Sequence, residues 1–200
     1  MDSLADPRSI IDDEIADFQA NTDLAELAID ELVSTYRDNL ESRHVLVKVI
    51  AINALYHARV LDIDMQGLSI HITKIDALDE RLKQGEPEVV DEIWKFRGRT
   101  KRHYLSIATK FCNWHNKKAY AIYDGNTWEA LVAYGNRGDT FAFPERRFFK
   151  YAVYLSIVKR FQNSYSLEKY SLKDIDKFLW RVGGRLIEAK KAQPRTPATV

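Results

Sequence analysis

Two residues of opposite charge, Lys110 and Asp124, stand fourteen positions apart near the middle of the chain. An amine can act as a nucleophile in covalent catalysis, and a carboxylate can stabilise positive charge that develops in a transition state. Held on successive elements, the two side chains could therefore support amine nucleophilic chemistry. The alternative is a surface lysine and an ordinary helix N-cap, because most charged residues carry no chemistry.

The apolar pattern around these residues predicts the elements that would hold them. Residues 103–116 carry apolar side chains at three- and four-residue steps, which predicts a helix containing Lys110. Residues 119–123 form a short extended segment, after which Asp124 caps a further helix. The side chains expected on the inner faces are Leu105, Ile107, Ala108, Phe111 and Cys112 in the first helix, and Trp128, Leu131 and Val132 in the second.

Helical periodicity covers most of the remaining chain, and no segment shows the sustained alternation of a strand. Residues 43–59 are apolar almost all round, which predicts a buried central helix; a buried strand is the rival, but the run is too long for one. The sequence therefore predicts an all-α fold of nine or so helices. The other helices are expected over residues 9–19, 23–40, 68–84, 87–96, 143–163 and from 171 onward, with a polar loop over residues 135–140.

The last predicted helix carries two local signals. Ser171 and Asp174 have the spacing of a capping box. Gly183 and Gly184 would each weaken the helix by about 1 kcal/mol relative to alanine unless another element packs closely there. We interpret residues 1–193 as a single all-helical domain, with acidic helices in 1–40, a body in 41–193 and a flexible tail in 194–200.

Composition places the chain among soluble globular proteins, since 46% of its 200 residues are apolar and 30% are charged. A single cysteine, Cys112, excludes a disulfide framework and an iron–sulfur cluster. The five histidines lack metal-ligand spacing, so we expect no metal and no cofactor. The acidic N-terminus lacks the apolar region of a signal peptide, and no apolar run approaches the ~20 residues of a membrane span. The predicted location is the cytoplasm.

Charge is distributed unevenly along the chain. Residues 1–40 contain eleven acids and two bases, whereas residues 41–200 contain 28 bases and 18 acids. Five of those bases fall within residues 95–102. A basic body with an acidic N-terminal segment is compatible with a polyanionic partner and with screening of the basic face by the protein itself. It is also compatible with an ordinary solvated surface.

The central stretch resembles the active-site region of the helix-hairpin-helix DNA glycosylases, the superfamily of endonuclease III and 8-oxoguanine DNA glycosylase. Residues 107–110, Ile-Ala-Thr-Lys, stand where that family has its lysine motif, and residues 121–124, Ala-Ile-Tyr-Asp, where it has its aspartate motif. Residues 51–54 resemble the end of the family's buried helix, and residues 114–116, Trp-His-Asn, resemble a divergent bacterial branch. Ser106 and Ala108 replace the hairpin glycines of the family.

The resemblance implies a glycosylase or lyase that acts on a modified or damaged base in DNA. Lys110 would attack the sugar C1′ of a flipped nucleotide, and Asp124 would stabilise the cationic transition state. Asn53 would fill the gap left by the extruded base. The other residues that the resemblance places at the substrate are Trp114, His115, Tyr123 and Trp128 around the base, and Arg97, Arg99, Lys101 and Arg102 at the DNA backbone.

Two alternatives remain open at this point. The chain could be a catalytically inactive helical module that binds nucleic acid or a protein. It could also be a structural or regulatory protein whose acidic N-terminus covers the basic face. An enzyme requires that Lys110 Nζ and the Asp124 carboxylate face one cleft within several ångströms of each other, so their geometry bears on the choice. The sequence leaves the oligomeric state open.

Overall fold

The computed structural model describes residues 4–135 and 150–192, and over these ranges the chain is all-α. The predicted fold class is therefore confirmed. Nine helices lie in the described ranges and no strand occurs there: α1 (Pro7–Thr35), α2 (Ser42–Tyr56), α3 (Asp62–Ile72), α4 (Leu78–Gln84), α5 (Glu88–Trp94), α6 (Leu105–His115), α7 (Gly125–Gly135), α8 (Tyr151–Ser164) and α9 (Leu172–Ala192).

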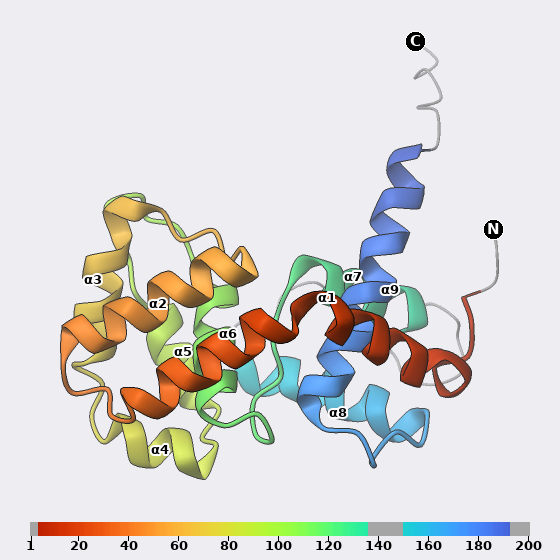
Figure 1. Cartoon of the computed structure of the whole chain (residues 1–200), viewed down its shortest axis with the longest axis horizontal. Coiled ribbons are helices and arrows are strands. Elements are labelled where there is room, and N and C mark those ends of the chain that lie inside the picture. Colours follow the sequence, from red (N-terminus) through yellow and green to blue (C-terminus); the bar gives the residue numbers. More distant parts are fainter. Residues whose placement is uncertain (1–3, 136–149, 193–200) are drawn as a thin grey trace.

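The helices form two groups that α1 spans (Figure 1). Helices α2–α6 gather at one end of the molecule, and α7–α9 gather at the other. Helix α1 contacts α2 and α6 in the first group and α9 in the second. Lys110 belongs to α6 and Asp124 directly precedes α7, so the two candidate residues come from different groups and meet where the groups join.

Helix α1 is one continuous helix, whereas the sequence predicted two, over residues 9–19 and 23–40. The predicted break does not occur, and no glycine or proline interrupts the chain between Pro7 and Thr35. Pro7 occupies the first turn, where its missing N–H costs nothing, and the Asp6 side chain accepts a hydrogen bond from the Arg8 N–H at 2.9 Å. The end at Thr35 is five residues earlier than predicted.

Helix α2 confirms the helix predicted over residues 43–59, but the expectation that it is buried all round is wrong. Val47 and Ile50 are 44% and 45% exposed, while Lys48 is fully buried. The buried face consists of Val45, Lys48, Val49 and Ile52, which recur at helical spacing. Only one face of α2 is covered by other helices, and apolar composition alone did not reveal which one.

The segment predicted as one helix from 68 to 84 contains two, α3 and α4. Ala77, which directly precedes α4, has a left-handed backbone with φ of 48°. A single helix cannot run through this conformation from α3 into α4. Pro87 directly precedes α5, close to the position predicted for it. Predicted features over residues 136–149, including the rest of the polar loop and the start of the helix at Phe143, lie outside the described residues, as does the tail 194–200.

Helices α7 and α9 pack against each other, and glycine at position 183 of α9 allows the two backbones to approach closely. A Cβ added to Gly183 would overlap the backbone carbonyl of Asn126 in α7. The close packing that would justify glycine inside a helix is therefore present. The capping box is also confirmed, because the Asp174 carboxylate accepts from the Ser171 N–H at 3.0 Å and the Ser171 hydroxyl accepts from the Asp174 N–H at 3.1 Å. These features fix the start of α9 and its distance from α7.

Among the helices of the described ranges, none combines the length and the apolar character needed to cross a membrane.

Candidate functional site at the junction of α6 and α7

Helix α6 places Lys110 in the interior of the protein. Ile107, Ala108, Phe111 and Cys112 are fully buried around it, and Lys110 itself is only 3% exposed. Its Nζ donates a hydrogen bond to the Ser106 hydroxyl, one helical turn earlier, at 2.8 Å. Ser106 and Ala108 both lie within α6, so the positions of the family's hairpin glycines are helical in this chain.

The extended segment that leads to Asp124 is fixed by side chains rather than by a neighbouring strand. Buried backbone groups need hydrogen-bond partners, and here helices α6 and α8 supply them. The segment therefore has a defined path across the core, and Asp124 is held at its end. The four bonds join Asn113 Nδ2 to Tyr120 O at 2.6 Å, Tyr151 Oη to Ala121 O at 2.8 Å, Tyr154 Oη to Ile122 O at 2.6 Å, and Tyr123 N to Thr109 Oγ1 at 3.0 Å.

Lys110 and Asp124 form an ion pair, with 3.1 Å between Nζ and Oδ2. The other carboxylate oxygen, Oδ1, accepts a hydrogen bond from the Asn126 N–H at 3.0 Å, so Asp124 caps α7 as predicted. The separation satisfies the distance part of the condition stated for an enzyme, whereas a shared cleft for the two groups stays a prediction. The Lys110 side chain is 4% exposed and that of Asp124 is 22% exposed, so solvent reaches the pair from the carboxylate side.

A second buried carboxylate, Asp176 on α9, stands near this pair and was missed in the sequence. Burial raises the pKa of Asp176 to about 6, although Lys173 and Lys110 act to lower it; Asp124 raises it further. The Asp176 carboxylate accepts a hydrogen bond from the Thr127 hydroxyl at 3.2 Å. Its position between Leu172 and Leu179 on the apolar stripe of α9 is the sequence signal that could have revealed it.

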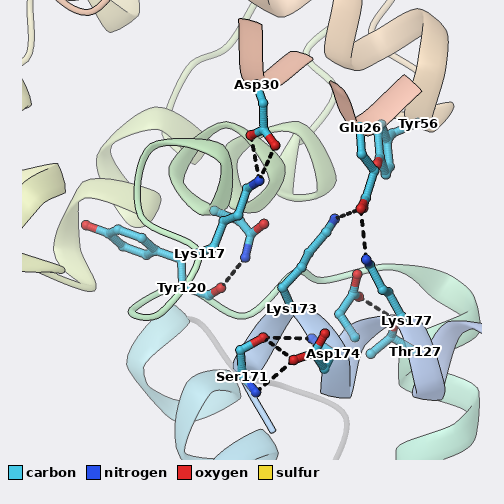
Figure 2. Close-up of polar contacts among 12 residues, drawn as sticks. Glu26, Asp30, Tyr56, Lys117, Tyr120, Thr127, Ser171, Lys173, Asp174 and Lys177 are labelled. Atoms are coloured by element: carbon cyan, nitrogen blue, oxygen red, sulfur yellow. Dashed lines mark hydrogen bonds and ion pairs between the residues drawn. The ribbon is translucent and has the colours of Figure 1, made fainter. Parts of the chain in front are cut away.

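Further charges line the junction between the two helix groups (Figure 2). Lys173 and Lys177 both reach Glu26 of α1 from α9, at 3.4 and 2.8 Å. The Tyr56 hydroxyl of α2 donates to the same carboxylate at 3.1 Å. Burial acts to raise the pKa of Glu26, but the two lysines and the tyrosine outweigh it, and the pKa is lowered. Glu26 therefore connects α1, α2 and α9 in its charged form.

Trp114, predicted to contact the base, lies in the same junction and is 3% exposed. Lys117 Nζ and Lys173 Nζ lie 4.4 and 4.9 Å from the centroid of its ring, and the Tyr56 ring meets it edge-on at 5.7 Å. The indole is enclosed by protein groups in this arrangement. It helps to pack the two helix groups together.

His115, also predicted at the substrate, lies next to Lys48 of α2. Its Nδ1 donates to the Phe111 carbonyl at 2.8 Å, which leaves Nε2 unprotonated and 3.4 Å from Lys48 Nζ. Burial and the Lys48 charge lower the pKa of His115 to about 4. A surface cavity of about 290 Å³ adjoins the ring, lined by Arg37, Asp79, Leu82, Lys83, His115 and Asn116.

Tyr123 and Trp128 are the predicted base-contacting residues that flank Asp124 most directly. Both side chains are half-buried, and their ring centroids are 6.2 Å apart. Tyr123 also meets Tyr154 of α8 edge-on, with 5.3 Å between the ring centroids. Along the chain, Tyr123 directly precedes Asp124, and Trp128 follows it by about one helical turn.

Asn53 closes a turn within the first helix group. Its amide donates to the Val60 carbonyl at 3.2 Å and accepts from the Val60 N–H at 2.8 Å. The side chain therefore fixes the segment between α2 and α3. A role in filling a gap in DNA would require it to leave these two partners.

The four bases predicted at the DNA backbone, Arg97, Arg99, Lys101 and Arg102, are exposed on the loop between α5 and α6. The buried Asp64 carboxylate organises this loop, because it accepts from the Arg99 N–H at 2.7 Å, the Tyr104 hydroxyl at 2.6 Å and the Thr100 hydroxyl.

A Cβ at Gly98 would overlap the Asp64 carboxylate, so glycine is required for this approach. The basic loop thus has a fixed backbone and leads directly into the helix that carries Lys110.

The structure therefore brings together Lys110 and Asp124, with Tyr123 and Trp128 beside them. It places Trp114 in the packed junction, and it places His115 and Asn53 in other environments. Within residues 4–135 and 150–192, no group of three or more His, Cys, Asp or Glu side chains could hold a metal ion.

Comparison with known proteins gives a family but no activity. An "Uncharacterized protein" of Haemophilus influenzae is 33% identical over 123 residues, which are 60% of this chain and 58% of the relative. The chain thus spans less than two thirds of the length of that relative. No solved structure matches the chain.

A protein-family model, HI_0787_N, described as an N-terminal domain, matches residues 10–119. The match runs from α1 through α6, so it contains Lys110 but ends before Asp124. Because it covers more than half of the 200 residues, the chain belongs to the HI_0787_N N-terminal domain family.

Proposed function

We propose that this protein is a DNA glycosylase/lyase-like protein acting on a modified or damaged base, with Lys110 as the amine nucleophile and Asp124 as its electrostatic support. One observation carries the proposal: Lys110 Nζ and Asp124 Oδ2 lie 3.1 Å apart although they come from successive elements. The resemblance of residues 107–110 and 121–124 to the glycosylase motifs supplies the reaction type.

In the proposed reaction, water that enters with the nucleotide first takes a proton from the Lys110 ammonium group. The neutral amine then attacks C1′ of the flipped nucleotide, and the bond from C1′ to the base breaks. The base leaves with the bonding electron pair and takes up a proton. Nitrogen loses a proton, the bond from C1′ to the ring oxygen breaks, and that oxygen takes up a proton, which gives a Schiff base. Loss of a C2′ proton then forms a C2′–C3′ double bond as the 3′-phosphate leaves. The Asp124 carboxylate, which accepts from the Asn126 N–H at the N-terminus of α7, stabilises the cationic sugar.

Access to the nucleophile sets a condition on this reaction. Lys110 is 3% exposed and is held by Ser106 and Asp124, so the nucleotide has to reach it past the partly exposed Asp124 and separate the pair. The exposed bases of the loop before α6 would hold the phosphate backbone. The proposal therefore includes a local opening between α6 and α7 when the duplex binds.

The burial of Lys110 favours a second candidate function. A lysine enclosed in an ion pair can act purely as a structural link between α6 and α7, and the protein would then be a catalytically inactive helical module that binds nucleic acid or a protein. The exposed loop bases are compatible with this function as well. Chemistry at Lys110 is what separates the two candidates.

Borohydride trapping tests the first candidate. Duplexes with one abasic site or one oxidised or alkylated base are incubated with the protein and reduced, and the adduct is located by peptide mapping. We expect the adduct on Lys110, its loss in Lys110→Gln, and its retention in Lys118→Gln, which changes an exposed lysine eight residues away. Asp124→Asn keeps an oxygen for the Asn126 N–H and should lower the rate by about 100-fold.

The folded state of each variant is checked by thermal unfolding before trapping. An equal yield of adduct with folded Lys110→Gln would overturn the proposal. Duplex binding without any adduct or base release by the unmodified protein would support the inactive module instead.

A further inference from the structure

Four bases of α9 form a stripe along one side of that helix. Lys173, Lys177, Arg181 and Arg185 recur every four residues, and side chains at this spacing lie above one another on a helix face. We call these four residues the basic stripe. The glycosylase resemblance assigns no role to it.

Acids of α1 pair with the basic stripe in antiparallel order. Glu14 lies 2.5 Å from Arg185 and 3.3 Å from Arg181, and Asp17 lies 2.8 Å from Arg181. Further along α1, Glu26 takes the two lysines of the stripe. Burial acts to raise the pKa of Glu14, but the arginines outweigh it and the pKa is lowered. The acidic N-terminal segment thus covers the basic face in the manner that the charge asymmetry of the sequence suggested.

The two halves of the stripe differ in accessibility. The side chains of Lys173 and Lys177 are 6% and 5% exposed, so they belong to the packed junction. Those of Arg181 and Arg185 are 28% and 51% exposed, and Asp17 opposite them is 68% exposed. The guanidinium groups of the outer half can therefore be reached from solvent. Of their carboxylate partners, Asp17 is open, whereas the Glu14 side chain is only 12% exposed.

We propose that Arg181 and Arg185 are a binding surface for the phosphate backbone of a nucleic-acid duplex, and that Glu14 and Asp17 occupy this surface in the free protein. Arginine guanidinium groups bind carboxylates and phosphates with the same planar donor geometry, so a phosphate can replace the exposed Asp17 and share the remaining donors with Glu14. The choice of a duplex as partner rests on the proposed function, but the surface does not depend on chemistry at Lys110.

Binding of an undamaged duplex measures the surface directly. Glu14→Gln/Asp17→Asn removes the two competing charges while keeping side-chain size. We expect duplex binding to be about tenfold tighter at low salt. The slope of log K against log salt concentration should become steeper by an amount that corresponds to up to about two additional phosphate contacts. Adding Arg181→Gln/Arg185→Gln to this variant should cancel the gain.

Asp13→Asn/Glu31→Gln is the matched control. It changes the net charge by the same amount at two exposed positions of α1, and it leaves the pairs of Arg181 and Arg185 in place. If the control tightens binding as much as Glu14→Gln/Asp17→Asn does, or if the added arginine substitutions leave the gain intact, the proposed surface is wrong. Thermal unfolding verifies that each variant is folded.

The measurement is repeated in the Lys110→Gln background on undamaged DNA. If Glu14→Gln/Asp17→Asn tightens duplex binding in this background, the binding surface is supported even when borohydride trapping fails. If the two substitutions do not tighten binding although trapping succeeds, the binding surface alone is wrong. The two proposals are therefore tested separately.

Discussion

Two buried lysines, Lys110 and Lys48, show how similar burial can serve different purposes. Lys110 is 3% exposed and Lys48 is fully buried, and both come from helices of the same group. Lys110 faces a carboxylate from the next element and a serine hydroxyl. Lys48 faces the C-terminal end of α1, where its Nζ donates to the Tyr36 carbonyl at 2.8 Å, the Asp38 carbonyl at 3.1 Å and Asn39 Oδ1 at 2.6 Å.

The two lysines differ in the hydrogen-bond acceptors that their ammonium groups contact. The last carbonyls of a helix lack partners within the helix, and Lys48 supplies donors to this end of α1 and to the chain that follows. All three of its protons are used in that way, and burial lowers its pKa to about 8. Lys110 instead compensates one negative charge, that of Asp124 at the start of α7.

Burial of a lysine is therefore a weak indicator of chemistry by itself. The identity of the acceptors carries the information, because a carboxylate on a separate element can take part in a reaction and backbone carbonyls mainly fix the fold. Three substitutions test this distinction through stability, beginning with the largest expected effect.

Lys110→Met should lower the free energy of unfolding by about 3–5 kcal/mol, because Asp124 then remains partly buried without its partner. The double variant Lys110→Met/Asp124→Asn should recover at least half of that loss, since it leaves no unpaired charge at this position. Urea unfolding of the two single variants and the double variant gives the coupling energy. A double variant as unstable as the sum of the single variants would mean that the pair does not compensate as described.

Asp176→Asn should remove a pH dependence that is specific to the Lys110 region. The pKa of Asp176 is raised from 3.8 to about 6, so the folded state binds its proton more strongly than the unfolded state between these values. Its contribution to stability therefore falls as pH rises from about 4 to about 6 and then stays level.

A shift of about two units corresponds to about 3 kcal/mol. The stability of Asp176→Asn relative to the unmodified protein should thus rise by about that amount between pH 4 and pH 7, measured by urea unfolding at both values. No change in this difference would show that Asp176 titrates as it does in the unfolded chain.

Lys48→Met should lower the free energy of unfolding by about 2 kcal/mol at pH 7, because three acceptors lose their donor while the cost of burying an ammonium group is relieved. The folded-state pKa of about 8 lies below the ordinary 10.5. That cost is present below pH 8 and is relieved as pH rises towards 10.5, so the unmodified protein should gain stability relative to the variant over this window.

Hydrogen exchange localises the effect of this substitution, with faster exchange expected at the C-terminal end of α1. Adding Asn39→Ala should give no recovery, in contrast to the double variant at Lys110, because the backbone carbonyls remain without a donor. Recovery in this double variant would remove the distinction between the two lysines.

The sequence determined most of the helices and the local signals that begin them. The spacing of apolar residues located α2, α6 and α9, and the capping box at Ser171 and Asp174 formed as predicted. Asp124 capped α7 for the same reason, since an N-cap depends on neighbouring N–H groups that are close in the chain. Features set by residues a few positions apart could be predicted from residue order alone.

Tertiary structure decided the features that depend on which faces meet. Composition suggested that α2 is buried on all sides, yet Val47 and Ile50 are exposed and Lys48 is buried, because one face alone is covered. The sequence pattern also predicted two helices where α1 is continuous. Packing of α1 against both helix groups outweighs the weak local preference for a break.

The sequence by itself determined that Lys110 and Asp124 stand on successive elements with the chemical types that amine catalysis needs. Only the tertiary structure decided that they meet at 3.1 Å, because that depends on buried backbone groups of residues 120–123 finding partners on α6 and α8. It also placed Asp176 nearby and the acids of α1 on the basic stripe of α9. Such contacts join residues up to 171 positions apart, and no spacing rule within one helix reaches that far.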